Sequence, residues 1–290
     1  MRIQSKLPAI ISIIIVLYAC QGTYTIPGYV PPPATSPSGN NSSGSLLLKT
    51  VMLHGADTND VATYTYNSNN QLLTLYAVAY SPGQKQATSY VITRDAAGKI
   101  TQYSKQTTVN GLASGAPVIH YIHYPSGSNN FDYAISSSVA NGTVIKDSTI
   151  YTFVNDLVSK GVDYMSFGGA FAKTSTYEYS YDANGNNTQI KLTIEGNLQR
   201  VVNYMFTYDN NNASMKWNND NVLLTGYGPA KNNYLTTSVG EANPTPSSFK
   251  LNATYSYTYA ASGYPSKGTS TVITKNPDST MNYSSYYFYK

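Results

Sequence analysis

The sequence predicts an all-β protein, a large antiparallel β-meander of repeated hairpins that is strongly curved or closed into a barrel-like sheet. Three observations lead to this fold class. The 290 residues include 29 Tyr but only 18 Lys and Arg and 14 Asp and Glu, and Tyr favours strands. Tyr alternates with polar residues, as in Tyr-Glu-Tyr-Ser-Tyr at 177–181. Turns rich in Asn, Asp and Gly follow these ladders at regular intervals.

The composition also bounds the class of protein. Hydrophobic residues make up 41% of the chain, enough apolar surface to offset the entropy lost when a domain folds. The single Cys excludes a disulfide framework, and with only 3 His it argues against a Cys/His zinc site. No Lys/Arg cluster follows the N-terminal segment, which argues against nucleic acid as a partner. We expect no cofactor.

Residues 1–19 are typical of a signal peptide. Arg2 and Lys6 precede an apolar run at 7–16, which is too short to span a bilayer as a helix, since that takes about 20 residues. The segment Leu-Tyr-Ala-Cys at 17–20 resembles a bacterial lipobox, in which cleavage occurs before a lipidated Cys. The resemblance implies lipidation at Cys20 and a membrane partner through that anchor. An ordinary secretory signal with a chance Cys is the alternative.

Residues 20–45 are predicted to form the lipidated Cys and a tether. The segment after the Cys is rich in Pro, Ser, Gly and Asn, a composition that does not pack a core. Gln21, not Asp, follows Cys20, and by resemblance to sorted lipoproteins of diderm bacteria this implies the outer membrane. No acidic residue lies between Gln21 and Ser45, unlike in some surface-displayed Bacteroidetes lipoproteins. A periplasm-facing anchor is therefore favoured over the cell surface.

The domain predicted over 46–290 consists of repeated hairpins. Seven turns are each preceded by a strand that ends at Tyr66, Arg94, Tyr124, Val154, Tyr181, Tyr208 or Tyr259. Consecutive positions are 27 to 30 residues apart, except for a last step of 51. That step is nearly two periods, which predicts a degenerate copy with a longer loop between Trp217 and Phe249. Seven or eight hairpins predict fourteen to sixteen strands, and no segment supports a helix of ordinary length.

A sheet of this size has to curl or close. One hairpin cannot bury its aromatic face alone, but neighbouring hairpins form a continuous face. Twist accumulates across many strands and free edges promote aggregation, so a curved or barrel-like sheet follows. A propeller is disfavoured because a four-stranded blade takes about 40 residues.

Two turns share a Tyr-Asp start: Tyr-Asp-Ala-Asn-Gly-Asn at 181–186 and Tyr-Asp-Asn-Asn-Asn at 208–212. They resemble the YD repeats of Rhs-type shell proteins, in which Tyr-Asp precedes the turn and Gly-Asn follows it. Together with the lipobox, the chain resembles a family of uncharacterised Bacteroidetes lipoproteins whose domain has been described as porin-like. The resemblance covers 46–290 and implies a porin-like β fold, but it implies no activity.

Catalytic and metal-binding motifs are scarce. His120 and His123 come nearest to a metal motif, but a spacing of three on a strand puts them on opposite faces, and we predict no metal site. The chain has no Gly-x-Ser-x-Gly elbow, Walker-type loop or Cys/His nucleophile pair. An enzyme is the third reading, and it requires three or more carboxyl or imidazole groups to converge in one pocket.

The tyrosine ladders are expected mainly to pair across strands and build the sheet. A single sheet cannot bury 29 rings, so some must face solvent, a lumen or a partner. Trp217 with nearby Tyr227 and Tyr234 is the predicted ligand-binding cluster, for a glycan or an envelope protein. A core plug is the favoured alternative for Trp217.

These observations predict a non-enzymatic cell-envelope lipoprotein with a structural or binding role. The alternative is a membrane-inserted or pore-like β-barrel. Its lipid-facing side would need an apolar band about 25 Å tall, whereas the faces that hold Glu178, Ser180, Ser256 and Thr258 are polar.

Overall fold

The computed structural model describes residues 46–54, 58–81, 84–140, 142–196, 199–215, 218–243, 250–275 and 278–290. The predicted signal peptide, Cys20 and the tether lie outside the described residues, and so does Trp217. No helix in the described ranges is long and apolar enough to cross a membrane.

The described chain folds into one 17-stranded antiparallel sheet. The strands are β1 (Leu47–His54), β2 (Thr58–Tyr66), β3 (Leu72–Ser81), β4 (Gln84–Arg94), β5 (Ile100–Val109), β6 (Leu112–Ala113), β7 (Val118–His123), β8 (Tyr133–Ala140), β9 (Thr143–Val154), β10 (Leu157–Phe167), β11 (Ala172–Tyr181), β12 (Asn187–Ile194), β13 (Arg200–Tyr208), β14 (Tyr234–Asn243), β15 (Lys250–Tyr259), β16 (Pro265–Lys275) and β17 (Ser279–Tyr289). A short helix, α2 (Asp220–Thr225), interrupts the connection from β13 to β14.

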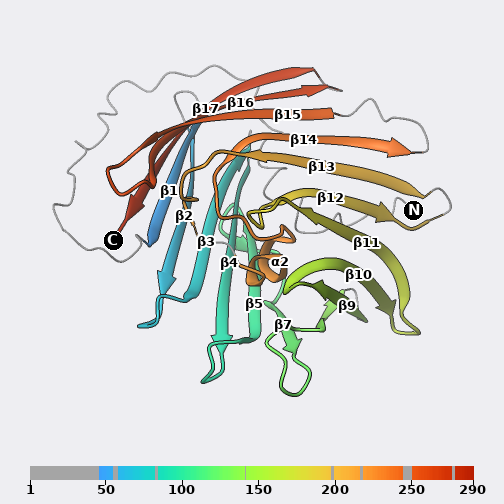
Figure 1. Cartoon of the computed structure of the whole chain (residues 1–290). Coiled ribbons are helices and arrows are strands. Elements are labelled where there is room, and N and C mark those ends of the chain that lie inside the picture. Colours follow the sequence, from blue (N-terminus) through green and yellow to red (C-terminus); the bar gives the residue numbers. More distant parts are fainter. Residues whose placement is uncertain are drawn as a thin grey trace.

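The sheet closes into a barrel (Figure 1). β1 pairs with β2 on one side and with β17 on the other, for example Val51 with Val61 and with Tyr286. Sixteen strands form the closed meander, and the two-residue β6 is an extra strand that pairs with β5 only. Closure leaves no long unpaired edge in the described sheet. This removes the exposed strand edges through which open sheets aggregate. The predicted fold class and strand number are confirmed.

The sequence repeat corresponds to one hairpin turn of the meander. Because each repeat contains two antiparallel strands, its final residue always returns to the same end of the barrel. We call this end, where β2, β4, β7, β9, β11, β13, β15 and β17 finish, the tyrosine end. Tyr66, Tyr181 and Tyr208 share a role there: each hydroxyl donates a hydrogen bond to a carbonyl at the start of the preceding strand.

The long step of 51 residues has a different origin from the predicted one. Between Trp217 and Phe249 the described residues contain no degenerate hairpin. β14 and β15 complete one normal period, and the excess is a single connection, residues 209–233, inserted between β13 and β14. The prediction was wrong because an inserted loop and an extra hairpin lengthen the spacing equally.

The tight turns at the tyrosine end explain the Asn, Asp and Gly pattern. In the turn at 182–186 the Asp182 carboxylate accepts hydrogen bonds from the amides of Asn184 and Asn186, both at 2.9 Å. Gly185 has a φ of 82°, a left-handed conformation that glycine adopts without strain. The turn at 67–71 repeats this geometry with Asn67 in the role of Asp182 and Asn70 at a φ of 62°.

Alternation along each strand separates an aromatic inside from a polar outside. On β15 the side chains of Leu251 and Ala253 are buried in the interior, and Tyr255, Tyr257 and Tyr259 continue that face. The outward positions of the same strand are all exposed and polar: Lys250, Asn252, Thr254, Ser256 and Thr258. The tyrosine ladders therefore point into the barrel and form its core.

Candidate functional site

The connection at 209–233 enters the barrel and plugs it (Figure 1). Val222, Leu223 and Leu224 of α2 are buried and belong to the same hydrophobic core as the strand side chains. The helix ends at Gly226, which has a φ of 79° and donates its amide to the Val222 carbonyl. We call residues 218–228, which include α2, the plug.

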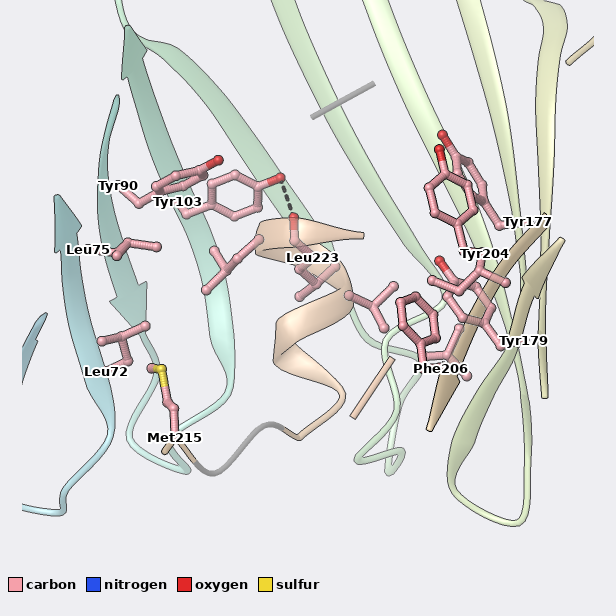
Figure 2. Close-up of a cluster of buried hydrophobic side chains, with 14 of the residues drawn as sticks. Leu72, Leu75, Tyr90, Tyr103, Tyr177, Tyr179, Tyr204, Phe206, Met215 and Leu223 are labelled. Atoms are coloured by element: carbon pink, nitrogen blue, oxygen red, sulfur yellow. Dashed lines mark hydrogen bonds between the residues drawn. The ribbon is translucent and has the colours of Figure 1, made fainter. Parts of the chain in front are cut away.

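Opposite walls of the barrel hold the plug in place. The Tyr103 hydroxyl on β5 donates to the Leu223 carbonyl at 2.8 Å, as Figure 2 shows. The Tyr179 hydroxyl on β11 donates to the Gly226 carbonyl at 3.0 Å. These two bonds satisfy carbonyls at the C-terminal end of a buried helix, which would otherwise lack partners. Nearer the tyrosine end, Arg94 forms an ion pair with Asp220 at 3.0 Å.

The plug separates two cavities. The inner cavity, about 180 Å³, lies against residues 222–226 of the plug and is walled by tyrosine rings. The strands provide its polar side chains Lys105, His120, Ser136, Asp147, Thr149 and Asp163, and the plug provides Thr225. The mouth cavity, about 790 Å³, lies at the tyrosine end and contacts Met215, Asn218 and Leu224.

The polar groups of the mouth cavity are largely engaged with the protein itself. Arg94 donates to the Gly98 carbonyl at 2.8 Å in addition to its ion pair with Asp220. The Lys99 ammonium donates to the Ser128 carbonyl at 2.6 Å and lies 5.3 Å from the centre of the Tyr124 ring. These contacts brace the turns against the plug and leave few free groups for a ligand.

The inner cavity carries an ordered row of polar side chains. His120 on β7 is paired with Ser136 on β8, and Ser136 is paired with Asp147 on β9. The three residues thus face the lumen at one level on three neighbouring strands. Lys105 on β5 and Asp163 on β10 line the same cavity outside this row, because Tyr103 is the β5 residue opposite His120 and Asp163 is opposite Thr149. This row interrupts the aromatic lining found elsewhere in the lumen. Buried polar and charged groups cost free energy unless they are paired.

His120 is held neutral by its surroundings. Its ring stacks on Tyr103 with centroids 4.4 Å apart and an angle of 10°. Burial, and secondly the charge of Lys105, lower the pKa of His120 to about 4. His123 faces outward instead, where it contacts Asp132 at 2.6 Å and stacks on Tyr133. The two histidines lie on opposite faces, as their spacing predicts.

Asp163 is satisfied by hydroxyl groups. Thr149 and Ser175 each donate a hydrogen bond of 2.7 Å to its two carboxylate oxygens. Burial nevertheless raises the pKa of Asp163 above its ordinary value, and the two hydroxyls oppose that shift. Its partners come from β9 and β11, so it connects three strands of the wall.

Lys105 and Ser136 are less well satisfied. The Lys105 ammonium lies 5.7 Å from the centre of the Tyr90 ring, and burial lowers the pKa of Lys105. Within the described ranges, no carboxylate forms an ion pair with it inside 4 Å. The Ser136 side chain is only 3% exposed, and its hydroxyl has no hydrogen-bond partner. An unpartnered buried hydroxyl costs about 1–3 kcal/mol.

The described residues contain no group of three or more His, Cys, Asp and Glu arranged to hold a metal ion. The inner cavity nevertheless gathers one imidazole and two carboxyl groups, from His120, Asp147 and Asp163. The enzyme hypothesis requires three or more carboxyl or imidazole groups in one pocket, and these three residues meet that requirement.

The predicted ligand-binding residues lie elsewhere. Tyr227 and Tyr234 both pack against Phe206, with ring centroids 5.8 Å and 5.4 Å away, and both are half-buried beside the core. They line neither cavity. Trp217, like Cys20, lies outside the described residues. Binding by this cluster stays a prediction.

Sequence reasoning missed Lys105, Asp147 and Asp163. A usable signal is present on β9, where Asp147 falls between Ile145 and Thr149 on the inward face that continues with Tyr151 and Phe153. A charged residue that occupies the same alternating positions as inward-facing aromatic residues also faces the core. What the sequence does not contain is the pairing of strands, which alone brings these side chains together.

No protein-family model and no curated protein matches the chain. Solved structures do match it. A porin-like protein from Bacteroides uniformis ATCC 8492 superposes with a TM-score of 0.50 at 12% sequence identity, covering 84% of this chain and 98% of that one. A porin-like protein from Bacteroides vulgatus ATCC 8482 has a TM-score of 0.49 and 11% identity, covering 85% and 99%. The fold is therefore a porin-like β-barrel.

Proposed function

We propose that this protein is a non-enzymatic binding barrel that holds a small polar ligand in the inner cavity. The observation that carries the proposal is the unpartnered Ser136 hydroxyl, buried beside that cavity in the row between His120 and Asp147. Perturbed titratable groups and unsatisfied polar groups concentrate at functional sites. A ligand that bonds to this row offsets the cost of burying it.

We place the barrel outside the bilayer. A transmembrane barrel turns apolar side chains to lipid and polar ones to its lumen. Here the arrangement is the reverse on β15, and on β11 and β12 an outward ion pair joins Glu178 to Lys191 at 2.9 Å. This pattern supports a water-facing exterior at β11, β12 and β15.

We retain the predicted anchor for this barrel. The lipobox-like segment at 17–20 supports lipidation at Cys20, with a tether to residue 45, as in the uncharacterised Bacteroidetes lipoproteins that the chain resembles. The porin-like description of the Bacteroides structures supports an outer-membrane location. The periplasmic face remains the favoured side.

A ligand screen tests the binding proposal. The full-length protein is heated with amino acids, monosaccharides and nucleobases, one at a time, and its melting temperature is measured. We expect at least one compound to raise the melting temperature of the wild type but not of Ala134→Met, in which a longer side chain fills the inner cavity. Ser137→Met, on the outward face of the same strand, is the matched control. The absence of any cavity-dependent shift overturns the proposal.

The second candidate is a pore, which the porin-like description of the neighbours favours. Passage through this barrel requires the plug to leave, although Tyr103, Tyr179 and Arg94 bind it to three strands. We expect no release of a small fluorescent dye from liposomes incubated with the wild type. Release, and faster release by the double variant Tyr103→Phe, Tyr179→Phe, would establish the pore instead.

The third candidate is an enzyme, favoured by the convergence of His120, Asp147 and Asp163. A serine nucleophile needs a hydrogen bond to its base, and the Ser136 hydroxyl has none. We expect a fluorophosphonate probe to label the wild type no more than Ser136→Ala. Labelling specific to Ser136 would replace the binding proposal with a hydrolytic one.

A further inference from the structure

The walls of the inner cavity differ in charge from one side to the other. β5, β7 and β8 provide the Lys105 ammonium, the His120 imidazole and the Ser136 hydroxyl, all of which can donate hydrogen bonds. β9 and β10 provide the carboxyl groups of Asp147 and Asp163. The cavity is thus dipolar, with its positive side on the strands that precede β9.

In the described ranges, the positive side of the cavity forms no ion pair. Lys105 has no carboxylate within 4 Å in the described part of the chain, and the Ser136 hydroxyl is unpartnered. Lysine in this setting loses solvation without gaining a partner, which is why burial lowers its pKa. A carboxylate on a ligand supplies the missing charge and accepts bonds from both groups.

The negative side offers Asp147 as the acceptor. Asp163 lies on β10 opposite Thr149, one strand farther from Ser136 than Asp147. Asp147 is half-buried and lies in the same row as Ser136 and His120. Because Asp147 is directly opposite Ser136, a ligand ammonium next to a carboxylate held at Ser136 meets Asp147 first.

The spacing between His120 and Asp147 fits a ligand whose two charged groups are attached to the same carbon atom. His120 and Asp147 lie two strands apart, which at about 4.8 Å per strand separates their backbones by about 10 Å. An α-amino acid has its ammonium and carboxylate on one carbon, and with a hydrogen bond of about 2.8 Å at each end it spans roughly 9 Å. The cavity of about 180 Å³ is smaller than pockets for drug-sized ligands, about 300–1,000 Å³.

The remaining wall is apolar. Val222 and Leu223 of the plug lie against the cavity, together with the rings of Tyr90, Tyr103 and Tyr177. A molecule held by its charged end would therefore direct an apolar side chain toward the plug.

We propose that the inner cavity binds a free, zwitterionic α-amino acid with a small apolar side chain. Its carboxylate lies toward Lys105, His120 and Ser136, and its ammonium contacts Asp147. This inference rests on the proposed binding function and names its ligand class.

Calorimetric titration of the full-length protein with four matched probes tests the ligand class. The probes are L-valine, L-valinamide (cation only), 3-methylbutanoate (anion only) and glucose (neutral and polar). We expect L-valine to bind at least tenfold more tightly than the other three. Cavity-dependent binding of glucose or of a singly charged probe, with none of valine, overturns the zwitterion but leaves the binding function standing. Binding of none of the four overturns the zwitterion, and the wider ligand screen then decides the binding function.

Variants assign the two ends of the ligand. Lys105→Met is expected to weaken valine binding at least tenfold, because it keeps the length of the side chain and removes its charge. Asp147→Asn is expected to weaken valine binding while leaving that of 3-methylbutanoate unchanged, so that the two affinities converge. Lys146→Met, on the outward face of β9, is the control and should bind like the wild type. Unchanged valine affinity in both cavity variants overturns the inference even if valine binds.

Discussion

Two halves of the barrel lumen are built from the same alternating strands but differ in content. The inner wall of β12 to β16 is mainly apolar: Ile190, Leu251 and Val272 are almost completely buried, and the rings of Phe206 and Tyr234 pack 5.4 Å apart. The inner wall of β5 to β10 carries Lys105 and Asp163 among its tyrosines. The first half has the character of a core, and the second has that of a binding site. A few inward residues decide the difference, because the backbone scaffold is shared.

The largest expected effect on stability is in the apolar half of the lumen, at β12 to β16. Leu251→Ala removes a side chain that is 1% exposed, so it should leave a cavity and lower the free energy of unfolding by about 2–5 kcal/mol. Urea unfolding followed by circular dichroism measures it. Asn252→Ala, the outward neighbour on β15, should change the free energy of unfolding by less than about 0.5 kcal/mol. Equal effects of the two variants would contradict the assignment of the inward face.

The next effect belongs to the polar half and depends on pH. The pKa of His120 is lowered to about 4, whereas an unfolded chain binds that proton near pH 6.5. Between these values the unfolded state holds more protons, so the free energy of unfolding falls as the pH falls, by up to about 3 kcal/mol.

Comparison with His120→Gln isolates this contribution. Asp163, whose pKa is raised, acts in the opposite direction but is present in both proteins. Lys105 and Asp147 also line the cavity and are retained in both. Unfolding in urea at pH 7 and at pH 4.5 should show a smaller loss for the variant. A loss of equal size would mean that His120 is not held neutral.

A smaller effect is expected where the plug joins the two halves. Tyr103→Phe removes the donor to the Leu223 carbonyl and leaves that carbonyl unpaired, at a cost of about 1–3 kcal/mol. Hydrogen exchange should quicken at the amide of Gly226. Tyr121→Phe, whose ring is 54% exposed on the outer face, is the control and should leave exchange at Gly226 unchanged. Protection that survives in Tyr103→Phe would show that the hydroxyl does not hold the plug.

The smallest effect is at Ser136. Its hydroxyl is buried without a partner, so Ser136→Ala should leave the ligand-free protein as stable or stabilise it by about 1 kcal/mol. The measurement is again urea unfolding, in the absence of any added ligand. A loss of stability would reveal a hydrogen bond to that hydroxyl and remove the observation on which the binding proposal rests.

Local features of the sequence were sufficient for much of the fold. Alternation predicted strands, and turns such as 182–186 follow from the chemistry of Asp and Gly in sequence. The Tyr found before most of the turns has a role of its own at three of them, since Tyr66, Tyr181 and Tyr208 bond to the preceding strand. Each of these interactions spans one hairpin, so the period of the sequence carries it.

Closure, the plug and the site depend on distant contacts. The sequence predicted a curved or a closed sheet, and only the pairing of β1 with β17 decides between them. α2 is six residues long, which is too short for a helical period to appear in the sequence. The step of 51 residues indicated where the repeat is interrupted, but not that the interruption is a connection with a helix. Asp147 meets Ser136 only through strand register, which no single segment encodes.

The pairing of β1 with β17 also brings the first and last strands of the barrel together at the tyrosine end. The Lys290 amide donates to the Leu46 carbonyl at 3.1 Å, so the chain enters and leaves the barrel at the tyrosine end, and Leu46 itself borders the mouth cavity. A tether from the proposed anchor at Cys20 would therefore join the barrel at that end. Under the proposed anchoring, the tether would join the barrel beside the mouth cavity, and a ligand entering at that end would have to pass the plug to reach Lys105.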